Sequence, residues 1–586
     1  MADASEKMDS GESDSPVQVE SARTMNGHYT NEDQAPVPYV SLQFIGIFVA
    51  SSLAYYAGVL GMSTSWNQLR SGVAESIGET SAGVNWALPT LVFTHTAGAF
   101  FLGRLTDYIG RRWPFVFANL IAFVGFIAAG RATSSKTFSG LNCLIGVGTG
   151  LQIQTPFLAL AELVPVDHRF FVTSLNVAAL SPLFALYPAI SEALTLHAHD
   201  SWRWAYSINA IISFVAFALL LVFYYPPTAS QQDELRTTSD GAPPKKDWIG
   251  LSVFTTVFAV FIYVVLWGNG TIYAWDKPQV IVLVTIFGLL FVLILAWMYI
   301  RGGEDAFFPG YILQSWDIWS WQFLSAWISM LYWFLPLAAG GCLQTVFLES
   351  GMTLAWDIAK WSAGLASGYI FAVIALYRFK AIKWQMCVAE AVAMTFLLPI
   401  CIIQAGRHNH LIAFITVAGF FIGYGIIVSH TASPLMARKR DLGLVQGTIA
   451  ALRGLIFTLL YALFETIYTT RLENQLESQV STAAVSVGLP ESSLQDLFEA
   501  IEAIEGGGSE SALLQVPGFT ETMINPIFAA VVSASSNAWR FILLIALVMF
   551  IPMWLFPFRL SHVDQFLTKD VWARLNPIGV KSVRRR

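Results

Sequence analysis

The stretch GRLTDYIGRR, Gly103–Arg112, separates two apolar runs and places four charged residues within ten positions. Its first glycine has no side chain, so the preceding helix can approach a neighbouring helix closely. Asp107 can lie at a helix end and pair either with Arg111 or with a helix across a cleft. A charged cluster of this kind can form when one face of a protein closes and break when that face opens. We therefore interpret the stretch as a gate whose residues are Gly103, Asp107, Gly110, Arg111 and Arg112.

The composition of the whole chain is that of an integral membrane protein. Of 586 residues, 55% are hydrophobic and 12% are charged, against about 25% charged residues in an ordinary soluble protein. Mean hydropathy is +0.57. The formal net charge of -6 argues against nucleic acid as a partner, because nucleic-acid-binding proteins usually present a basic face. The composition predicts an all-α membrane protein and excludes a set of soluble domains.

Apolar runs long enough to cross a bilayer recur along the chain and predict about 14 transmembrane helices. Residues 1–38 are acidic and polar, contain no apolar stretch, and are predicted to form a disordered cytoplasmic tail rather than a signal peptide. We place the spans near 41–62, 83–102, 113–130, 138–161, 171–190, 204–225, 248–267, 279–300, 319–339, 357–377, 384–404, 411–432, 443–468 and 539–558.

The distribution of basic residues predicts the orientation of these spans. With a cytoplasmic N-terminus, inner segments and the C-terminal tail carry 21 Lys and Arg, against 9 in outer segments, which indicates an even number of spans with both ends inside. One outer segment, residues 469–538, is much longer than the others. Its apolar residues recur at helical spacing and predict a small extracellular cap, or alternatively a lid that recruits a ligand. These residues are Leu494, Leu497, Phe498, Ile501 and Ile504.

The gate stretch matches the signature G-x-L-x-D-x-x-G-R-R of the major facilitator superfamily, and the chain resembles that superfamily's fourteen-span drug:proton antiporter branch. Five short motifs resemble the fungal trichothecene efflux pump family, which is close to the fungal siderophore transporters. The resemblance covers about residues 40–560. The motifs are SWRW (201–204), FYYPPT (223–228), DWIG (247–250), YAWDKPQVI (273–281) and VPGFT (516–520).

The resemblance implies a major facilitator fold with two six-helix bundles, at 39–225 and 319–558. A cytoplasmic linker at 226–247 and two inserted helices at 248–300 would lie between them, and a basic cytoplasmic tail at 559–586 would follow. The chain departs from the family pattern in span 4, where Asn142 stands at the position of an arginine. It also departs in span 5, where Ser181-Pro182 and Tyr187-Pro188 replace a Gly-Pro pair, and in span 13, which lacks the usual late glycine-rich run.

The resemblance implies a secondary transporter that exports a small organic compound, such as a secondary metabolite, toxin or drug, by proton antiport with alternating access. Proton-coupled uptake of a siderophore or similar chelate is the alternative. No Walker sequence or catalytic constellation indicates an ATP-driven pump or an enzyme. We expect protons, a small molecule and the lipid bilayer as partners, no cofactor, a monomer, and the plasma membrane as location.

Three ionisable residues inside predicted spans are candidates for proton coupling or substrate binding, because charges in a membrane are costly. They are His95 in span 2, Glu390 in span 11 and Arg453 in span 13. Each has a structural alternative: a hydrogen-bonded core histidine, a carboxylate satisfied by Lys383 or water, and an arginine that bridges helices. Asn269 begins a possible glycosylation sequon. No cysteine or histidine spacing indicates a metal site.

Overall fold

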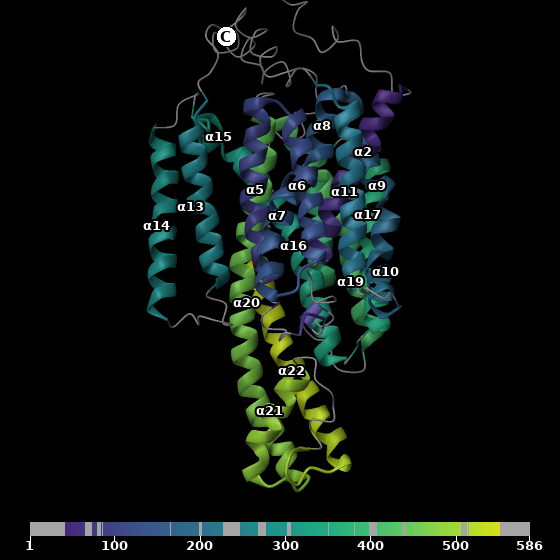
Figure 1. Cartoon of the computed structure of the whole chain (residues 1–586), viewed down its shortest axis with the longest axis vertical. Coiled ribbons are helices and arrows are strands. Elements are labelled where there is room, and N and C mark those ends of the chain that lie inside the picture. Colours follow the sequence, from purple (N-terminus) through teal and green to yellow (C-terminus); the bar gives the residue numbers. More distant parts are fainter. Residues whose placement is uncertain are drawn as a thin grey trace, which may run out of the picture.

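The computed structural model describes residues 41–64, 73–74, 76–78, 84, 86–164, 166–197, 202–226, 246–267, 277–301, 306–347, 349, 351–379, 381–397, 407–436, 441–505, 513 and 515–550. All regular elements in this part of the chain are helices, and most of them stand side by side along the long axis of the molecule (Figure 1).

The first bundle is built from helices that pack through their small and apolar faces, with α7 against α5, α6 and α2, and α11 against α6 and α2. Two of the predicted spans are broken within the bundle. Span 4 consists of α7 and α8, and span 5 consists of α9 and α10, which meet next to Pro182. The bounds are α2 Leu42–Thr64, α5 Ala87–Ile109, α6 Arg112–Gly130, α7 Ser135–Gln152, α8 Thr155–Leu163, α9 Val166–Ala179, α10 Ser181–His197 and α11 Arg203–Phe223.

The second bundle packs α17 and α18 against α19, and α16 against α19, α20 and α22. It meets the first bundle along two seams, α5 against α20 and α10 against α17. The bounds are α15 Gly310–Gln314, α16 Trp316–Val346, α17 Gly351–Arg378, α18 Ile382–Leu397, α19 His408–Ala432, η2 Ser433–Met436, α20 Leu442–Ser486, η4 Glu491–Ser493, α21 Leu494–Glu505 and α22 Glu521–Phe550.

Two inserted helices, α13 Trp248–Trp267 and α14 Pro278–Arg301, stand beside the bundles at the left of Figure 1. The inner helix α13 packs against α5 and α20, whereas α14 packs mainly against α13. Only 6% of the most apolar window of α14 is buried inside the protein. Since its exposed residues are strongly hydrophobic, this helix is suited to face lipid.

Closely spaced glycines let the helices approach one another. A Cβ at Gly146 would lie 2.6 Å from the Leu91 carbonyl oxygen, and one at Gly150 would lie 2.7 Å from the His95 carbonyl oxygen. These two glycines therefore hold α7 against the part of α5 that carries His95. The same kind of contact joins α17 to α19, through Gly364, Gly368, Gly419 and Gly423.

Eleven of the described helical segments are long and apolar enough to cross a membrane, so the all-α membrane fold is confirmed but the count of 14 is not. The predicted spans 83–102, 384–404 and 539–558 overlap α5, α18 and α22, which are not among the eleven. The charged stretch that we expected to connect two spans is also largely helical. Helix α5 continues through Asp107 to Ile109, so Gly103 and Asp107 belong to its last turns.

Helix α20 has 45 residues and continues well beyond the predicted end of span 13. Its lower half forms, with α21 and the start of α22, a structure that extends below the other helices in Figure 1. The predicted helix at Leu494–Glu505 is present as α21. Its residues Leu497 and Ile501 share a separate hydrophobic core with Val480, Ala484 and Ile527. We call this structure, described at residues 476–505, 513 and 515–528, the cap.

Candidate functional site

Asp107 joins the two bundles by binding the N-terminus of α20. Its carboxylate accepts hydrogen bonds from the backbone N–H groups of Gly443, at 2.9 Å, and Leu444, at 2.8 Å. The first N–H groups of a helix have no partner inside the helix, and the helix dipole favours a negative charge there. Of the two partners that the sequence allowed, Asp107 therefore uses the helix across the interface, and not Arg111.

A buried ion pair lies beside this contact. Arg104 of the first bundle is 2.7 Å from Asp441, which directly precedes α20, and 3.5 Å from Asp107. The side chains of Arg104 and Asp441 are 6% and 1% exposed, and Tyr311 donates a further hydrogen bond to Asp441 at 2.7 Å. Sequence reasoning singled out neither Arg104 nor Asp441. The available signal was an acid that follows the basic run 438–440 immediately before a predicted helix.

The other residues of the predicted gate stabilise the first bundle itself. Arg111 pairs with Glu162 at 2.8 Å and donates to the Leu158 carbonyl oxygen. Arg112 donates to the Leu221 carbonyl oxygen, and its guanidinium lies 3.7 Å from the centroid of the Tyr225 ring. Gly110 ends α5 with a φ of 92°, which only glycine adopts readily. These contacts hold the C-terminal end of α5 in place, and Arg104 and Asp107 of that end contact the start of α20.

Gly103 permits the close approach of α5 and α20 at the gate. A Cβ at this position would lie 2.6 Å from the Gly443 carbonyl oxygen. Overpacking of this kind costs about 1–3 kcal/mol, so Gly103→Ala should lower the closed-to-open ratio of the gate about 5- to 150-fold. We expect a transport rate reduced by at least threefold at normal expression. Gly140→Ala is the matched control, since nothing lies within 4 Å of a Cβ there; equal rates for both variants would contradict this role of Gly103.

Farther along the same seam, His95 of α5 meets Arg453 of α20, two of the three residues predicted for coupling or binding. Arg453 Nη2 is 2.8 Å from His95 Nε2, and His95 Nδ1 is 3.0 Å from the Thr149 hydroxyl. Because Nε2 faces a donor, it must accept, so the imidazole is neutral here with its hydrogen on Nδ1. That hydrogen is donated to Thr149, whose hydroxyl donates in turn to the Gly146 carbonyl oxygen at 3.1 Å.

Arg453 is a buried cation without a carboxylate partner among the residues that the structure describes. Its guanidinium lies 4.4 Å from the centroid of the Trp333 ring, and its Nε has no hydrogen-bond partner within the described residues. The Trp333 ring also packs edge-on against the His95 ring, with the two ring centroids 5.1 Å apart. Tyr55 and Tyr369, whose hydroxyls lie 3.4 Å apart, join the bundles nearby. The arrangement is a positively charged point in an aromatic interior.

Glu390, the third candidate, is not part of this group. It lies on α18, which packs against α19 and contacts neither α5 nor α20 to a comparable extent. Its side chain is buried, and Oε1 has no hydrogen-bond partner in the described part of the chain. Asn269 lies outside the described residues, so its possible glycosylation stays a prediction.

Two helical bundles that meet at a charged gate, with ionisable residues buried between them, define a secondary transporter of the major facilitator class. The model of the fungal trichothecene efflux pump (TRI12) family matches residues 17–577. The chain belongs to this family, which consists of membrane transporters and not of enzymes.

Two individual relatives are distant in sequence but match most of the chain. The trichothecene efflux pump TRI12 of Fusarium sporotrichioides is 23% identical over 91% of this chain and 88% of its own length. The pump of the same name from Trichoderma arundinaceum is 24% identical over the same shares. Among solved structures, a double-tryptophan mutant of XylE aligns with 90% of this chain and 98% of its own, with 12% identity and a TM-score of 0.49.

Proposed function

We propose that this transporter exports a fungal toxin or related secondary metabolite across the plasma membrane in exchange for protons, acting as a monomer. The names of its relatives make a trichothecene the first compound to test. One observation carries the proton-coupling part of the proposal: the neutral His95 accepts a hydrogen bond from Arg453 across the interface of the bundles. Each chain contains both bundles, so one copy provides a complete interface.

The contact between His95 and Arg453 can couple a proton to a change of conformation. A proton on Nε2 would remove the acceptor that Arg453 uses and place two cations at 2.8 Å in a buried site. The pair would separate, and α5 and α20 would lose a contact that joins the bundles. Protonation from the outer side would thus displace Arg453 from the position in which its Nε, unpartnered among the described residues, can donate to an oxygen atom of the substrate, so that proton and substrate are bound in alternation. Alternating access then follows if the proton leaves on the opposite side.

His95→Gln tests this coupling, because glutamine keeps an acceptor for Arg453 but cannot take up a proton. In cells that express wild-type protein, efflux of a radiolabelled trichothecene should accelerate in acidic medium and stop with a protonophore. We expect the rate of this proton-driven efflux to be at least tenfold lower in His95→Gln than in the wild type. In proteoliposomes without a pH gradient, exchange of labelled for unlabelled compound should persist.

His197→Gln is the matched control, since His197 lies exposed at the end of α10. Proton-driven efflux by His95→Gln equal to that of His197→Gln would overturn the coupling role. Wild-type protein that transports no trichothecene in either assay would instead overturn the substrate assignment. Net accumulation of compound in cells, rather than loss, would contradict export and support the uptake alternative.

A further inference from the structure

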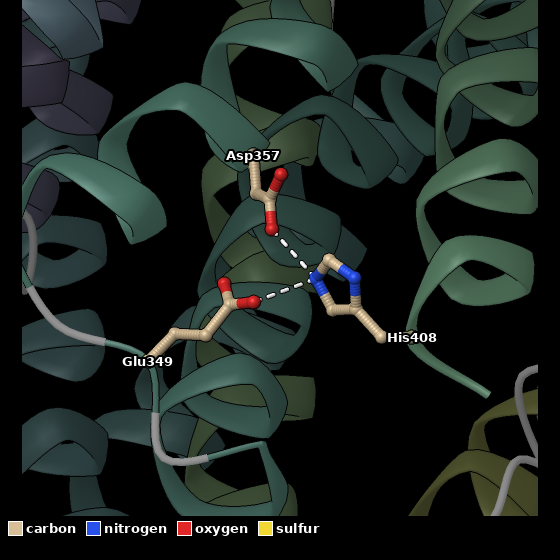
Figure 2. Close-up of side chains that lie close together, drawn as sticks. All are labelled: Glu349, Asp357 and His408. Atoms are coloured by element: carbon tan, nitrogen blue, oxygen red, sulfur yellow. Dashed lines mark hydrogen bonds and ion pairs between the residues drawn. The ribbon is translucent and has the colours of Figure 1, made fainter. Parts of the chain in front are cut away.

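A second cluster of polar side chains lies at the other end of the second bundle, far along α16 from the gate. Glu349 follows α16, Asp357 lies in the first turns of α17, and His408 begins α19 (Figure 2). The three residues come from separate segments, and their side chains point toward one another. With a cytoplasmic N-terminus, the predicted topology places them on the extracellular side.

The distances within the cluster are unusual for hydrogen bonding alone. His408 Nε2 lies 2.6 Å from Glu349 Oε1 and also 2.6 Å from Asp357 Oδ2. A nitrogen of imidazole carries at most one hydrogen, which can point well at only one of the two oxygens. The second ring nitrogen does not help, because it faces Asn409 Oδ1 at 3.4 Å. A hydrogen on Nε2 therefore leaves one carboxylate unsatisfied at this point.

The two carboxyl groups face each other as well as His408, and a hydrogen bond between them requires that one of them is protonated. Asp357 is 5% exposed, and its Oδ1 accepts a hydrogen bond from Lys360, which leaves Oδ2 directed at the cluster. Glu349 Oε2 is buried without a hydrogen-bond partner among the described residues. The Glu349 carboxyl group, 16% exposed, therefore lies in a crowded and largely buried site together with a second carboxyl group. Crowding of this kind is relieved when a cation occupies the space between the oxygens.

We propose that Glu349, Asp357 and His408 bind a divalent transition metal ion of the zinc class on the extracellular side. One imidazole nitrogen and two carboxylate oxygens, all within 4.8 Å of one another, match the ligand types that Zn²⁺ accepts. The nitrogen disfavours Ca²⁺ and Mg²⁺, which prefer oxygen ligands throughout. To admit the ion, the ligand atoms would move apart to about 3.3 Å, as tetrahedral bonds of about 2.0–2.2 Å require.

Such an ion would tie the start of α17 to the start of α19 and to the segment that follows α16. Helix α17 matters for the whole molecule because it packs against α10 of the first bundle. The site is independent of the exported compound and of the proton-coupling proposal, so it can be tested without transport.

The test is zinc binding by the purified full-length protein in detergent, prepared without a polyhistidine tag and stripped of metal. Titration with Zn²⁺ against a chromophoric chelator should show one site per chain with a dissociation constant of micromolar or lower. We expect His408→Ala and Glu349→Gln each to weaken binding at least tenfold. Glu349 lies between helices, so its variant keeps the test informative even if a helical substitution impairs folding.

His410→Ala is the matched control, because this exposed histidine lies two residues from His408 on the same helix. Its zinc affinity should equal that of the wild type. Co²⁺ provides a spectroscopic check: the intense visible absorption of a tetrahedral site should appear with the wild type and disappear with His408→Ala. The proposal is overturned if the wild type binds Zn²⁺ only in the millimolar range, which would leave a shared proton as the occupant, or if His410→Ala loses as much affinity as His408→Ala.

Discussion

Replacing Asp107 with alanine should reduce transport at least tenfold while the protein still reaches the membrane in normal amounts. The variant loses two hydrogen bonds from the N-terminus of α20 to a charged acceptor. Hydrogen bonds to charged groups contribute about 1.5–3 kcal/mol each. The two bonds together contribute about 3–6 kcal/mol, and even a partial loss of about 2–4 kcal/mol from the closed gate alone would change its closed-to-open ratio about 30- to 900-fold. A transporter that cannot close one side cannot complete its cycle.

The series of substitutions at Asp107 separates charge from hydrogen bonding. Asp107→Asn keeps one acceptor oxygen but no charge, so its transport rate should lie between those of wild type and Asp107→Ala. Asp317→Asn is the matched control, since Asp317 lies in the first turn of α16, at the same end of the molecule, without an ion pair to another described residue. Efflux rates per molecule at the membrane measure the effect. Wild-type rates in Asp107→Ala would remove Asp107 from the gate.

Replacing Arg453 with methionine should lower transport about 100-fold without lowering thermal stability. Removal of one partner from a buried, charged contact costs about 2–5 kcal/mol when the other partner depends on it. Here the other partner would be the substrate, because the described structure offers Arg453 only a neutral imidazole and an aromatic ring. Since no carboxylate loses its counter-ion, the folded protein should tolerate an apolar side chain of similar length.

Arg453→Lys keeps the charge but not the planar guanidinium, which stacks on aromatic rings and donates in a fixed fork. We expect partial activity from it. Arg471→Met is the matched control on the same helix, because Arg471 also lies over an aromatic ring, that of Phe541, at 4.2 Å. Efflux assays and thermal unfolding should be run on the same preparations. A large drop in melting temperature for Arg453→Met, but not for Arg471→Met, would indicate the structural alternative of a bridge between helices.

The sequence predicted features whose cause is local. Apolar runs predicted most helices, and the first glycine of the gate stretch predicted a close approach of its helix to a neighbour. The end of α20 was predicted too early because residues 469–486 favour a helix by propensity but lack the apolar content of a span. The two prolines of span 5 predict a bent helix from the sequence, and the break between α9 and α10 lies next to Pro182.

Pairings between distant residues were not predictable from one sequence. Arg104 and Asp441 are 337 positions apart, and His95 and Arg453 are 358 positions apart. Periodicity assigns each residue to a helix face but does not show which faces meet across the bundles. The same limit explains why Glu349, Asp357 and His408 were missed. Metal-site motifs depend on short spacing, whereas these residues come together only through the packing of α17, α19 and the segment that follows α16.

The length of α20 has a mechanical consequence. At about 1.5 Å per residue, its 45 residues form a rod of about 68 Å, roughly twice the thickness of the hydrocarbon layer. One end of this rod binds Asp107, its first third carries Arg453, and its far end belongs to the cap. If α20 tilts as a rigid rod about its gate end, the cap at its far end would be displaced farther than the residues near the gate. The position of the cap would therefore differ between the open and the closed state of the gate.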